Sequence, residues 1–511
     1  MTISAPLSGL ESVRALLAAA DPQGRLMPCS LRELVVGEGT IGRVAELVET
    51  VAPAPADRRR RVSVVVDRTP ILRGTDDVKA VVVDLLSQDS DVTRVVLSDG
   101  HSELHVTDDV VAVAISECAD ADAIVAVGGG TISDIGKLVA AARPGLPIVT
   151  VMTAASVDGY TDDVSVTLKE GVKRTVPSVW PDAVLADAET VAGAPARMNR
   201  AGYGEMTSMY VAPADWRLAA LLGIDASFHP GPIELLEALS AGLDACAAGV
   251  STGDPQSVQQ LTYALALRGI ATGVAGSTAC LSGVEHLISH MLDLRAAQLH
   301  LPTGLHGEQV GAGSVVAACA WEMLRERLAA TPDAQVRPDT LDRVGAEARV
   351  REAFGSLDPS GRIGDECWRD YSRKLDRIEA ALPSINAVLA GWQDHVGALA
   401  ALVRPSTVIA AGKAVVWGSD GTPLSSARIP YDLSQPRPGW GEQNAEDWWS
   451  ALSGAVRRAA QTVDASRIAA ICVTHQRESF VCLDEDGQPL RPAMLWLDGR
   501  AVDEVDEFGT A

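Results

Sequence analysis

The chain has 511 residues, of which 47% are hydrophobic and 22% charged, and its formal net charge is −24. This composition is typical of globular proteins, and the negative charge argues against nucleic acid or an anionic membrane as a partner. Apolar runs are broken by Asp and Glu, so no candidate membrane span is found. The N-terminus lacks a signal-peptide pattern, and the eight cysteines include no C-x-x-C pair. A cytoplasmic protein is expected.

The first part of the chain alternates β-branched runs with helical stretches. Four runs predict buried parallel strands: 61–68, 93–100, 123–130 and 146–155. Two stretches between them predict helices: 78–88 and 133–143. Strands that alternate with helices favour a parallel sheet. Residues 1–175 are therefore expected to form an α/β domain with a Rossmann-like parallel sheet.

Two further regions follow in the chain. From residue 176 to 405 the strand patterns disappear, and segments such as 232–249 and 314–330 have helical spacing. This region predicts an all-helical domain. From residue 406 to 511, strand-like runs joined by Asp-Gly pairs predict hairpins.

Small-residue loops follow two neighbouring predicted strands. In AVGGGTISDIGK, three glycines precede a helix, an arrangement that lets backbone amides and the helix dipole approach a pyrophosphate. The pattern is not G-x-G-x-x-G, and a plain turn with Thr131 and Asp134 as helix caps is the alternative. The next strand ends in a loop with Thr153, Ser156 and Asp158. Adjacent strand ends are where an open α/β sheet binds ligands, although this loop would also serve as a tight connection.

Histidines are concentrated in the stretch GVEHLISHMLDLRAAQLHLPTGLHGEQVG. His286 and His290 are four residues apart and share one face of a predicted helix, and His306 follows after a loop. Two imidazoles and a carboxylate with an open position are typical of a catalytic zinc site. Glu205, in the motif AGYGEM, is the candidate carboxylate, and His300 is not expected to be a ligand. The alternative is a histidine pair on a solvated helix face.

The motifs GGGTISDIGK, TAASVDGY, AGYGEM, EHLISH and LHGEQVG occur in this order across residues 126–311. As an ordered set they resemble the iron/zinc-containing alcohol dehydrogenase superfamily, and within it the sn-glycerol-1-phosphate dehydrogenases. The resemblance implies NAD or NADP as cofactor and one divalent metal, zinc first, with nickel or iron as alternatives.

The resemblance also implies roles for individual residues. Glu205, His286 and His306 would bind the metal, Asp158 would bind substrate hydroxyls, and His290 would contact the substrate or relay a proton. The cofactor would be held by Gly128, Gly129, Gly130, Thr131, Asp134, Thr153 and Ser156.

Two positions depart from the family pattern. Glu205 stands where the family usually has Asp, but a carboxylate oxygen remains an acceptable metal ligand. Asp162 stands where related sequences have a small hydroxyl residue. A carboxylate close to a phosphate is unfavourable, so Asp162 is expected to disfavour NADP more than NAD.

The activity implied is a reversible, metal-dependent, NAD(P)H-linked reduction of dihydroxyacetone phosphate to sn-glycerol 1-phosphate. The expected partner is a small phosphorylated polyol or ketone, and a homo-oligomer is expected. Lys169, Lys173 and Arg174 are candidates to meet the phosphate, or they form a solvated basic turn. The alternatives are a dehydrogenase of another polyol or sugar-alcohol phosphate, and a catalytically idle fusion.

The C-terminal segment 413–511 resembles the N-terminal part of the FGGY carbohydrate kinases, in KAVVWGSDGTPL and VTHQRESFVCLDEDGQPL for example. Arg477 and Glu478 match a pair that holds polyol hydroxyls in that family. The glycine-rich phosphate loop expected before Lys413 and the ATP-binding half are missing. The resemblance implies a partial actin/ribonuclease-H-like α/β fragment over residues 406–511, without kinase activity.

Overall fold

The computed structural model describes residues 9–101, 103–169, 172–299, 301, 304–331, 334–355, 358–403, 413–417, 423–429, 442–461, 463, 481–484 and 488–494. The chain divides into two compact units. The first comprises Met1–Leu341 and Arg373–Arg404, and the second comprises Asp342–Ser372 and Pro405–Ala511. Among the described residues, no helix is long and apolar enough to cross a membrane.

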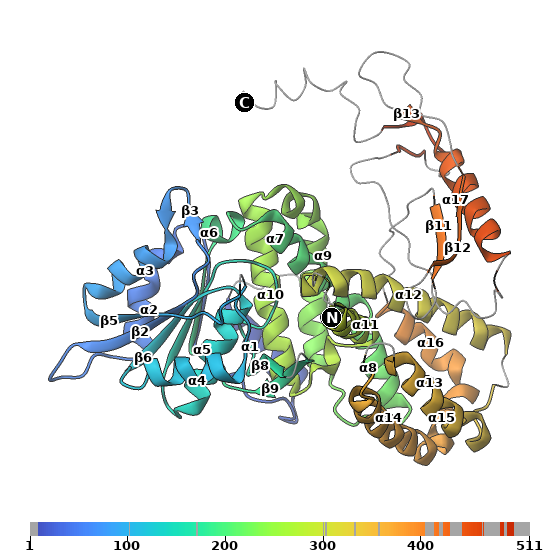
Figure 1. Cartoon of the computed structure of the whole chain (residues 1–511), viewed down its shortest axis with the longest axis horizontal. Coiled ribbons are helices and arrows are strands. Elements are labelled where there is room, and N and C mark those ends of the chain that lie inside the picture. Colours follow the sequence, from blue (N-terminus) through green and yellow to red (C-terminus); the bar gives the residue numbers. More distant parts are fainter. Residues whose placement is uncertain are drawn as a thin grey trace. The chain divides into compact units, whose positions relative to one another are not determined.

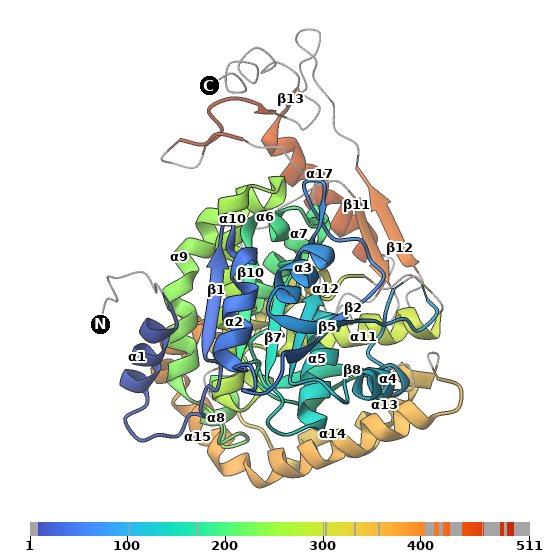
Figure 2. The same ribbon diagram turned by 90° about the vertical axis from the view of Figure 1, so that its left-hand side faces the viewer.

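The described part of the first unit contains a six-stranded parallel sheet with the order β1-β10-β7-β6-β2-β5 (Figures 1 and 2). Its strands are β1 (Glu33–Gly37), β2 (Arg60–Val66), β5 (Ser90–Val96), β6 (Ala123–Gly128), β7 (Ile148–Met152) and β10 (Ala183–Asp187). Strands β2, β5, β6 and β7 confirm the four expected strands. The other two, β1 and β10, were not expected, and β10 extends the sheet past the boundary expected at residue 175.

Side chains of the central strands alternate between two apolar cores, as the pleat of a strand dictates. In β2, Val64 faces one core and Val65 the other, and in β6 Val125 and Ile124 divide in the same way. Helices α2 (Val44–Val51) and α3 (Val78–Ser87) close the first core, and α4 (Asp108–Glu117) and α5 (Gly130–Ala142) close the second (Figure 1). Burial on both faces explains why these strands read as continuous apolar runs.

Helices dominate the rest of the first unit. The expected helical segments 232–249 and 314–330 lie in α9 and α12. The helices are α1 (Leu10–Ala20), α6 (Ala188–Ala192), α7 (Ala196–Met206), α8 (Ala212–Leu221), α9 (Pro230–Thr252), α10 (Pro255–Ala275), α11 (Val284–Gln298), α12 (His306–Ala330), α15 (Leu382–Ala390) and α16 (Trp392–Ala400). The chain after β7 forms an antiparallel hairpin of β8 (Val164–Lys169) and β9 (Val172–Pro177). The short strands β3 (Leu72–Arg73) and β4 (Asp76–Asp77) form a second antiparallel pair.

The second unit contains α13 (Arg343–Gly355), the first part of α14 (Arg362–Ala380), and a C-terminal segment. In that segment β11 (Lys413–Trp417) and β12 (Pro423–Arg428) form an antiparallel pair, which agrees with an expected hairpin, and α17 (Ala445–Ala460) packs against it. The short strands β13 (Glu442–Gln443) and β14 (Ala493–Met494) also pair. Arg477 and Glu478 lie outside the described residues.

Candidate metal and cofactor site

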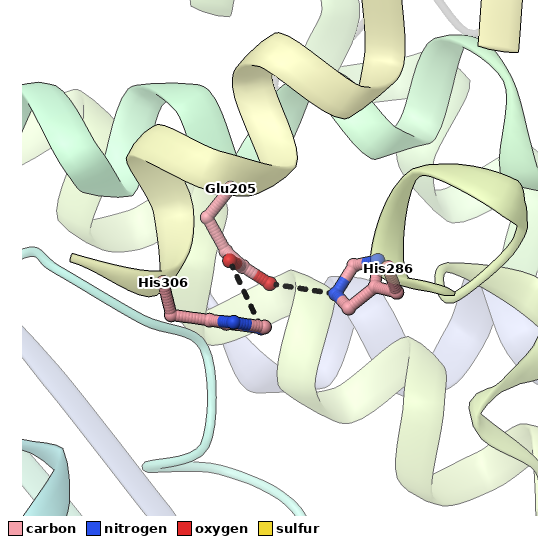
Figure 3. Close-up of side chains that lie close together, drawn as sticks. All are labelled: Glu205, His286 and His306. Atoms are coloured by element: carbon pink, nitrogen blue, oxygen red, sulfur yellow. Dashed lines mark hydrogen bonds and ion pairs between the residues drawn. The ribbon is translucent and has the colours of Figure 1, made fainter. Parts of the chain in front are cut away.

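Three helices of the first unit bring one carboxylate and two imidazoles together. Glu205 lies near the end of α7, His286 in the first turn of α11, and His306 is the first residue of α12. Their side chains point toward one another (Figure 3), and their ligand atoms all lie within 4.8 Å of one another. Glu205 Oε1 is 3.3 Å from His286 Nε2, and Glu205 Oε2 is 3.7 Å from His306 Nε2. The three residues expected as metal ligands therefore converge in space.

Glycines set how closely these helices approach. A Cβ atom at Gly307 would lie 1.9 Å from the carbonyl oxygen of Ala201 in α7, and one at Gly204 would lie 2.2 Å from the carbonyl oxygen of Gly307. At Gly313, where α12 crosses α11, a Cβ atom would lie 2.6 Å from the carbonyl oxygen of Glu285. Backbone carbonyls cannot rotate away, so only glycine permits these crossings. The glycines in AGYGEM and LHGEQVG therefore act through helix packing.

A chain of hydrogen bonds fixes the tautomer of His306. The Gln309 side-chain amide donates to Asp293 Oδ1 at 2.9 Å, so Gln309 Oε1 is the atom that accepts from Ser289 Oγ at 2.7 Å. Ser289 Oγ then accepts from His306 Nδ1, 3.0 Å away. This arrangement leaves the lone pair of His306 Nε2 facing the cluster. Burial, together with the charge of nearby cations, lowers the pKa of His306 to about 4, so the ring is neutral at physiological pH.

His286 is oriented by a carboxylate behind it. Its Nδ1 is 2.8 Å from Oε1 of the buried Glu285, which also accepts from the backbone N–H of Gly283 at 2.7 Å. Carboxylates placed in this way commonly orient histidines that bind metals. Burial lowers the pKa of His286, but the hydrogen bonds to Glu205 and Glu285 outweigh it and raise the pKa to about 9. A metal that binds through Nε2 must therefore displace a proton.

Glu205 is a buried carboxylate beside the two imidazoles. Burial raises the pKa of Glu205, but the charge of Arg268 and the contact with His286 outweigh it and hold the pKa well below its usual range. The carboxylate is therefore ionised. Its Oε2 atom is buried and has no hydrogen-bond partner among the described residues. Because a buried polar atom without a hydrogen bond is costly, this oxygen, 3.7 Å from His306 Nε2, fits a bound cation.

Arg268 of α10 is a member of this site that the sequence did not single out. It is 2% exposed, and its Nη1 contacts Glu205 Oε1 at 2.9 Å and also Asp158 Oδ2. The available signal was one charged side chain within the apolar run LTYALALRGIATGVA. A buried arginine needs acidic partners, but the sequence does not say which ones.

A cavity of about 320 Å³ opens beside the three converging residues. Its lining includes Gly130, Thr131, Asp134, Asp158, Lys173 and His290. Gly128 ends β6, and Gly129 is the N-cap of α5. Thr153 and Ser156 follow β7 and are buried, and they are not among the described residues that line this cavity. Burial and the charge of His286 lower the pKa of His290, so its ring is neutral at physiological pH.

The start of α5 faces this cavity without a side-chain cap. Because the N-cap residue is Gly129, no side chain engages the amides of Gly130 and Thr131 at the start of the helix, whereas the amide of Ile132 donates to the carbonyl oxygen of Gly129 at 3.1 Å. Asp134 lies further along α5, and its Oδ2 accepts from the backbone N–H of Val166 at 3.2 Å. Asp134 thus joins α5 to β8.

Asp162 is compensated within the fold. Lys137 Nζ lies 2.7 Å from Asp162 Oδ1 and 3.4 Å from Asp134 Oδ1, and both Lys137 and Asp162 are buried. Burial raises the pKa of Asp162, and although Lys137 opposes this, the pKa reaches about 7. This pairing removes the physical basis for expecting Asp162 to repel a phosphate as a free carboxylate.

The basic residues of the β8–β9 hairpin have different environments. Lys173 lines the cavity, but its Nζ is 2.7 Å from Asp293 Oδ2. Lys169 and Arg174 are exposed. His300 lies outside the described residues, so its expected lack of a ligand role stays a prediction.

Comparison with known proteins matches two parts of the chain to two families. Residues 35–195 match the iron-containing alcohol dehydrogenase family, and residues 410–510 match the N-terminal domain of the FGGY family of carbohydrate kinases. The glycerol-1-phosphate dehydrogenase of Pyrococcus abyssi is 33% identical over 241 residues, which cover 42% of this chain and 68% of that protein.

Two other glycerol-1-phosphate dehydrogenases are similar. That of Pyrococcus furiosus is 33% identical over 219 residues, covering 42% of this chain and 58% of that protein. That of Bacillus velezensis is 30% identical over 245 residues, covering 48% of this chain and 61% of that protein. The chain therefore belongs to the iron-containing alcohol dehydrogenase family, in the branch that contains the glycerol-1-phosphate dehydrogenases. It spans little more than half the length of several curated relatives that it matches, 58% for the Pyrococcus furiosus protein.

Proposed function

We propose that the first unit is a metal-dependent dehydrogenase that interconverts dihydroxyacetone phosphate and sn-glycerol 1-phosphate with NAD(P)H or NAD(P)+. The observation that carries this proposal is the convergence of Glu205, His286 and His306 beside a cavity, with the buried Glu205 Oε2 unpaired within the described structure. The names of the relatives support the choice of substrate.

The donor set suits a divalent transition metal. One carboxylate and two imidazoles are ligands that zinc accepts, and nickel and iron are also suited to imidazole. Glu205 Oε2, His286 Nε2 and His306 Nε2 would hold the ion, and Glu285 and Ser289 already orient the two rings. A metal held there would supply Lewis-acid polarisation of the substrate carbonyl.

The cofactor is assigned to the carboxyl ends of β6 and β7. Gly128, Gly129 and Gly130 let the pyrophosphate approach the uncapped start of α5, where free amides and the helix dipole favour an anion. Thr131, Asp134, Thr153 and Ser156 remain proposed cofactor residues. A cofactor held by these residues would supply the hydride for reduction of the carbonyl.

Two further side chains are assigned to the substrate. Asp158 lines the cavity and would accept a hydrogen bond from a substrate hydroxyl. His290, one helical turn after His286, would transfer the proton that accompanies the hydride. Its lowered pKa keeps a lone pair available near neutral pH, so in the oxidation of the alcohol it would accept the hydroxyl proton, and in the reduction the protonated ring would return it.

The strongly basic side chains that line the cavity are already engaged by carboxylates. Asp293 pairs with Lys173, and Glu205 and Asp158 pair with Arg268. Asp134 and Asp162 also line the cavity, and Lys137 compensates them. A divalent cation would add the positive charge that a phosphorylated substrate needs. Another polyol phosphate as substrate is compatible with the same groups.

A substrate panel tests the proposal. Dihydroxyacetone phosphate, dihydroxyacetone and phosphorylated tetruloses and pentuloses are each supplied with NADH and NADPH, to protein reconstituted with zinc, nickel or iron. Oxidation of the cofactor with dihydroxyacetone phosphate is expected, with loss on chelation and recovery on adding metal back.

Glu205→Gln should abolish both metal retention and turnover. Glu46→Gln is the matched control, because Glu46 of α2 forms an exposed ion pair with Arg43 and neither residue lines the cavity. Absence of turnover with every metal and substrate would favour the catalytically idle alternative.

A further inference from the structure

Arg268 places a fixed positive charge on the proposed metal carboxylate. It lies in α10, and its guanidinium is held on two sides. Nη2 donates to Ser208 Oγ at 2.9 Å and to the carbonyl oxygen of Leu281 at 3.1 Å. Nη1 contacts Glu205 Oε1 at 2.9 Å and also Asp158 Oδ2. Four contacts leave the group little freedom to move.

The two sides of the guanidinium have different roles. The Nη2 contacts are to a hydroxyl and a backbone carbonyl outside the cluster, and they tie α10 to its neighbours. The Nη1 contacts are to carboxylates that line the cavity, one of which is the proposed metal ligand. A buried guanidinium also needs acidic partners, and here both of them are carboxylates of the cavity.

The contact of Arg268 Nη1 with one oxygen of the Glu205 carboxylate leaves the other oxygen for a metal. Oε1 is engaged by Arg268 and faces His286 Nε2, whereas Oε2 has no partner among the described residues and faces His306 Nε2. A metal held by Oε2 would share one carboxylate with a buried guanidinium. Two cations that share one carboxylate repel each other, and burial weakens the screening of this repulsion by water.

We propose that Arg268 is a built-in competitor of the metal for Glu205, and that it sets a low affinity of this site for divalent cations. The inference rests on the metal role proposed for Glu205. Asp158 moderates the competition, because it shares the charge of Arg268. Neutralising Arg268 should therefore tighten metal binding, and neutralising Asp158 should weaken it.

The test is a calorimetric titration of the chelator-treated full-length protein with Zn²⁺. Arg268→Gln should bind zinc at least about tenfold more tightly than wild type, a difference of about 1.4 kcal/mol. Arg268→Lys retains the charge and should stay close to wild type. Thr262→Val removes a buried hydroxyl of α10 that donates to the carbonyl oxygen of Val258 at 2.7 Å, but no charge, so it is the matched control and should leave the zinc affinity unchanged. Circular dichroism shows whether each variant is folded.

Asp158→Asn should change the zinc affinity in the direction opposite to Arg268→Gln. It should weaken zinc binding severalfold, and it decides the question if Arg268→Gln fails to fold. Unchanged or weaker zinc affinity in folded Arg268→Gln would overturn the proposal, and so would unchanged or tighter affinity in Asp158→Asn.

Failure of the proposed function would be seen differently. If Glu205→Gln binds zinc as well as wild type does, the cluster is not the metal site. If wild type binds no zinc but Arg268→Gln does, Arg268 prevents zinc binding altogether, and the proposed competition is supported. If neither binds, both proposals fail.

Discussion

Substitution of Gly307 by alanine tests whether helix packing builds the cluster. The added Cβ atom would lie 1.9 Å from the carbonyl oxygen of Ala201, 2.6 Å from its carbonyl carbon and 3.1 Å from the backbone nitrogen of Glu205. All three atoms belong to the backbone of α7, so no change of rotamer relieves the clash. Restoring an ordinary contact of 3.4 Å requires α12 and α7 to separate by about 1.5 Å.

This displacement is large on the scale of metal coordination. His306 precedes Gly307 directly, and Glu205 lies on the helix from which α12 would separate. Metal–ligand distances tolerate deviations of about 0.2 Å, so the three ligands would no longer close around one ion. Zinc affinity should fall by at least about a hundredfold, which is the upper end of what loss of supporting contacts causes. Overpacking costs about 1–3 kcal/mol, so we expect a folded variant with a lower melting temperature.

The assay is a zinc titration paired with thermal unfolding. Gly304→Ala is the matched control, because its Cβ atom would meet Gln309 Nε2 at an ordinary 3.5 Å, two residues before His306. The control should match wild type in both measurements. Wild-type zinc affinity and melting temperature in Gly307→Ala would refute the conclusion that the crossing of α7 and α12 positions the ligands.

Two other substitutions probe the surroundings of the cluster. Ser289→Ala removes the acceptor for His306 Nδ1 and should weaken zinc binding by roughly tenfold to a hundredfold. An unchanged titration would contradict the tautomer inferred for His306. Burial raises the pKa of Asp215 from 3.8 to about 6, so folding takes up a proton, and the stability that this confers is lost as pH rises through about 6. An asparagine at this position cannot titrate, so the free energy of unfolding of Asp215→Asn minus that of wild type should increase by up to about 3 kcal/mol from pH of about 4 to about 7. Both free energies are measured by urea denaturation. A difference that stays flat across this interval would show that Asp215 does not titrate in that range.

Local patterns in the sequence predicted the central strands and the main helices. Buried strands flanked by helices on both faces are continuous apolar runs, and β2, β5, β6 and β7 were found for this reason. Strand β1 lies at the edge of the sheet and β10 between β1 and β7. The sequence analysis missed β1 because its run ELVVG has only three apolar residues, and it missed β10 because AVLAD continues directly into the helix α6.

The sequence also determined which residue types were available for the site. It revealed the unusual density of histidines and the small-residue loops after β6 and β7. It favoured His286 and His290 as neighbours, since they are one helical turn apart. Their shared helix face is a local property, and periodicity alone encodes it.

Only the tertiary structure decided which groups meet. It brings His286 next to His306 and Glu205, and it leaves His290 beside them in the cavity. It places Arg268 between Asp158 and Glu205. These distances depend on how closely α7, α10, α11 and α12 approach one another. That approach is set by contacts between glycines and backbone carbonyls that are far apart in the chain, and no local periodicity encodes such contacts.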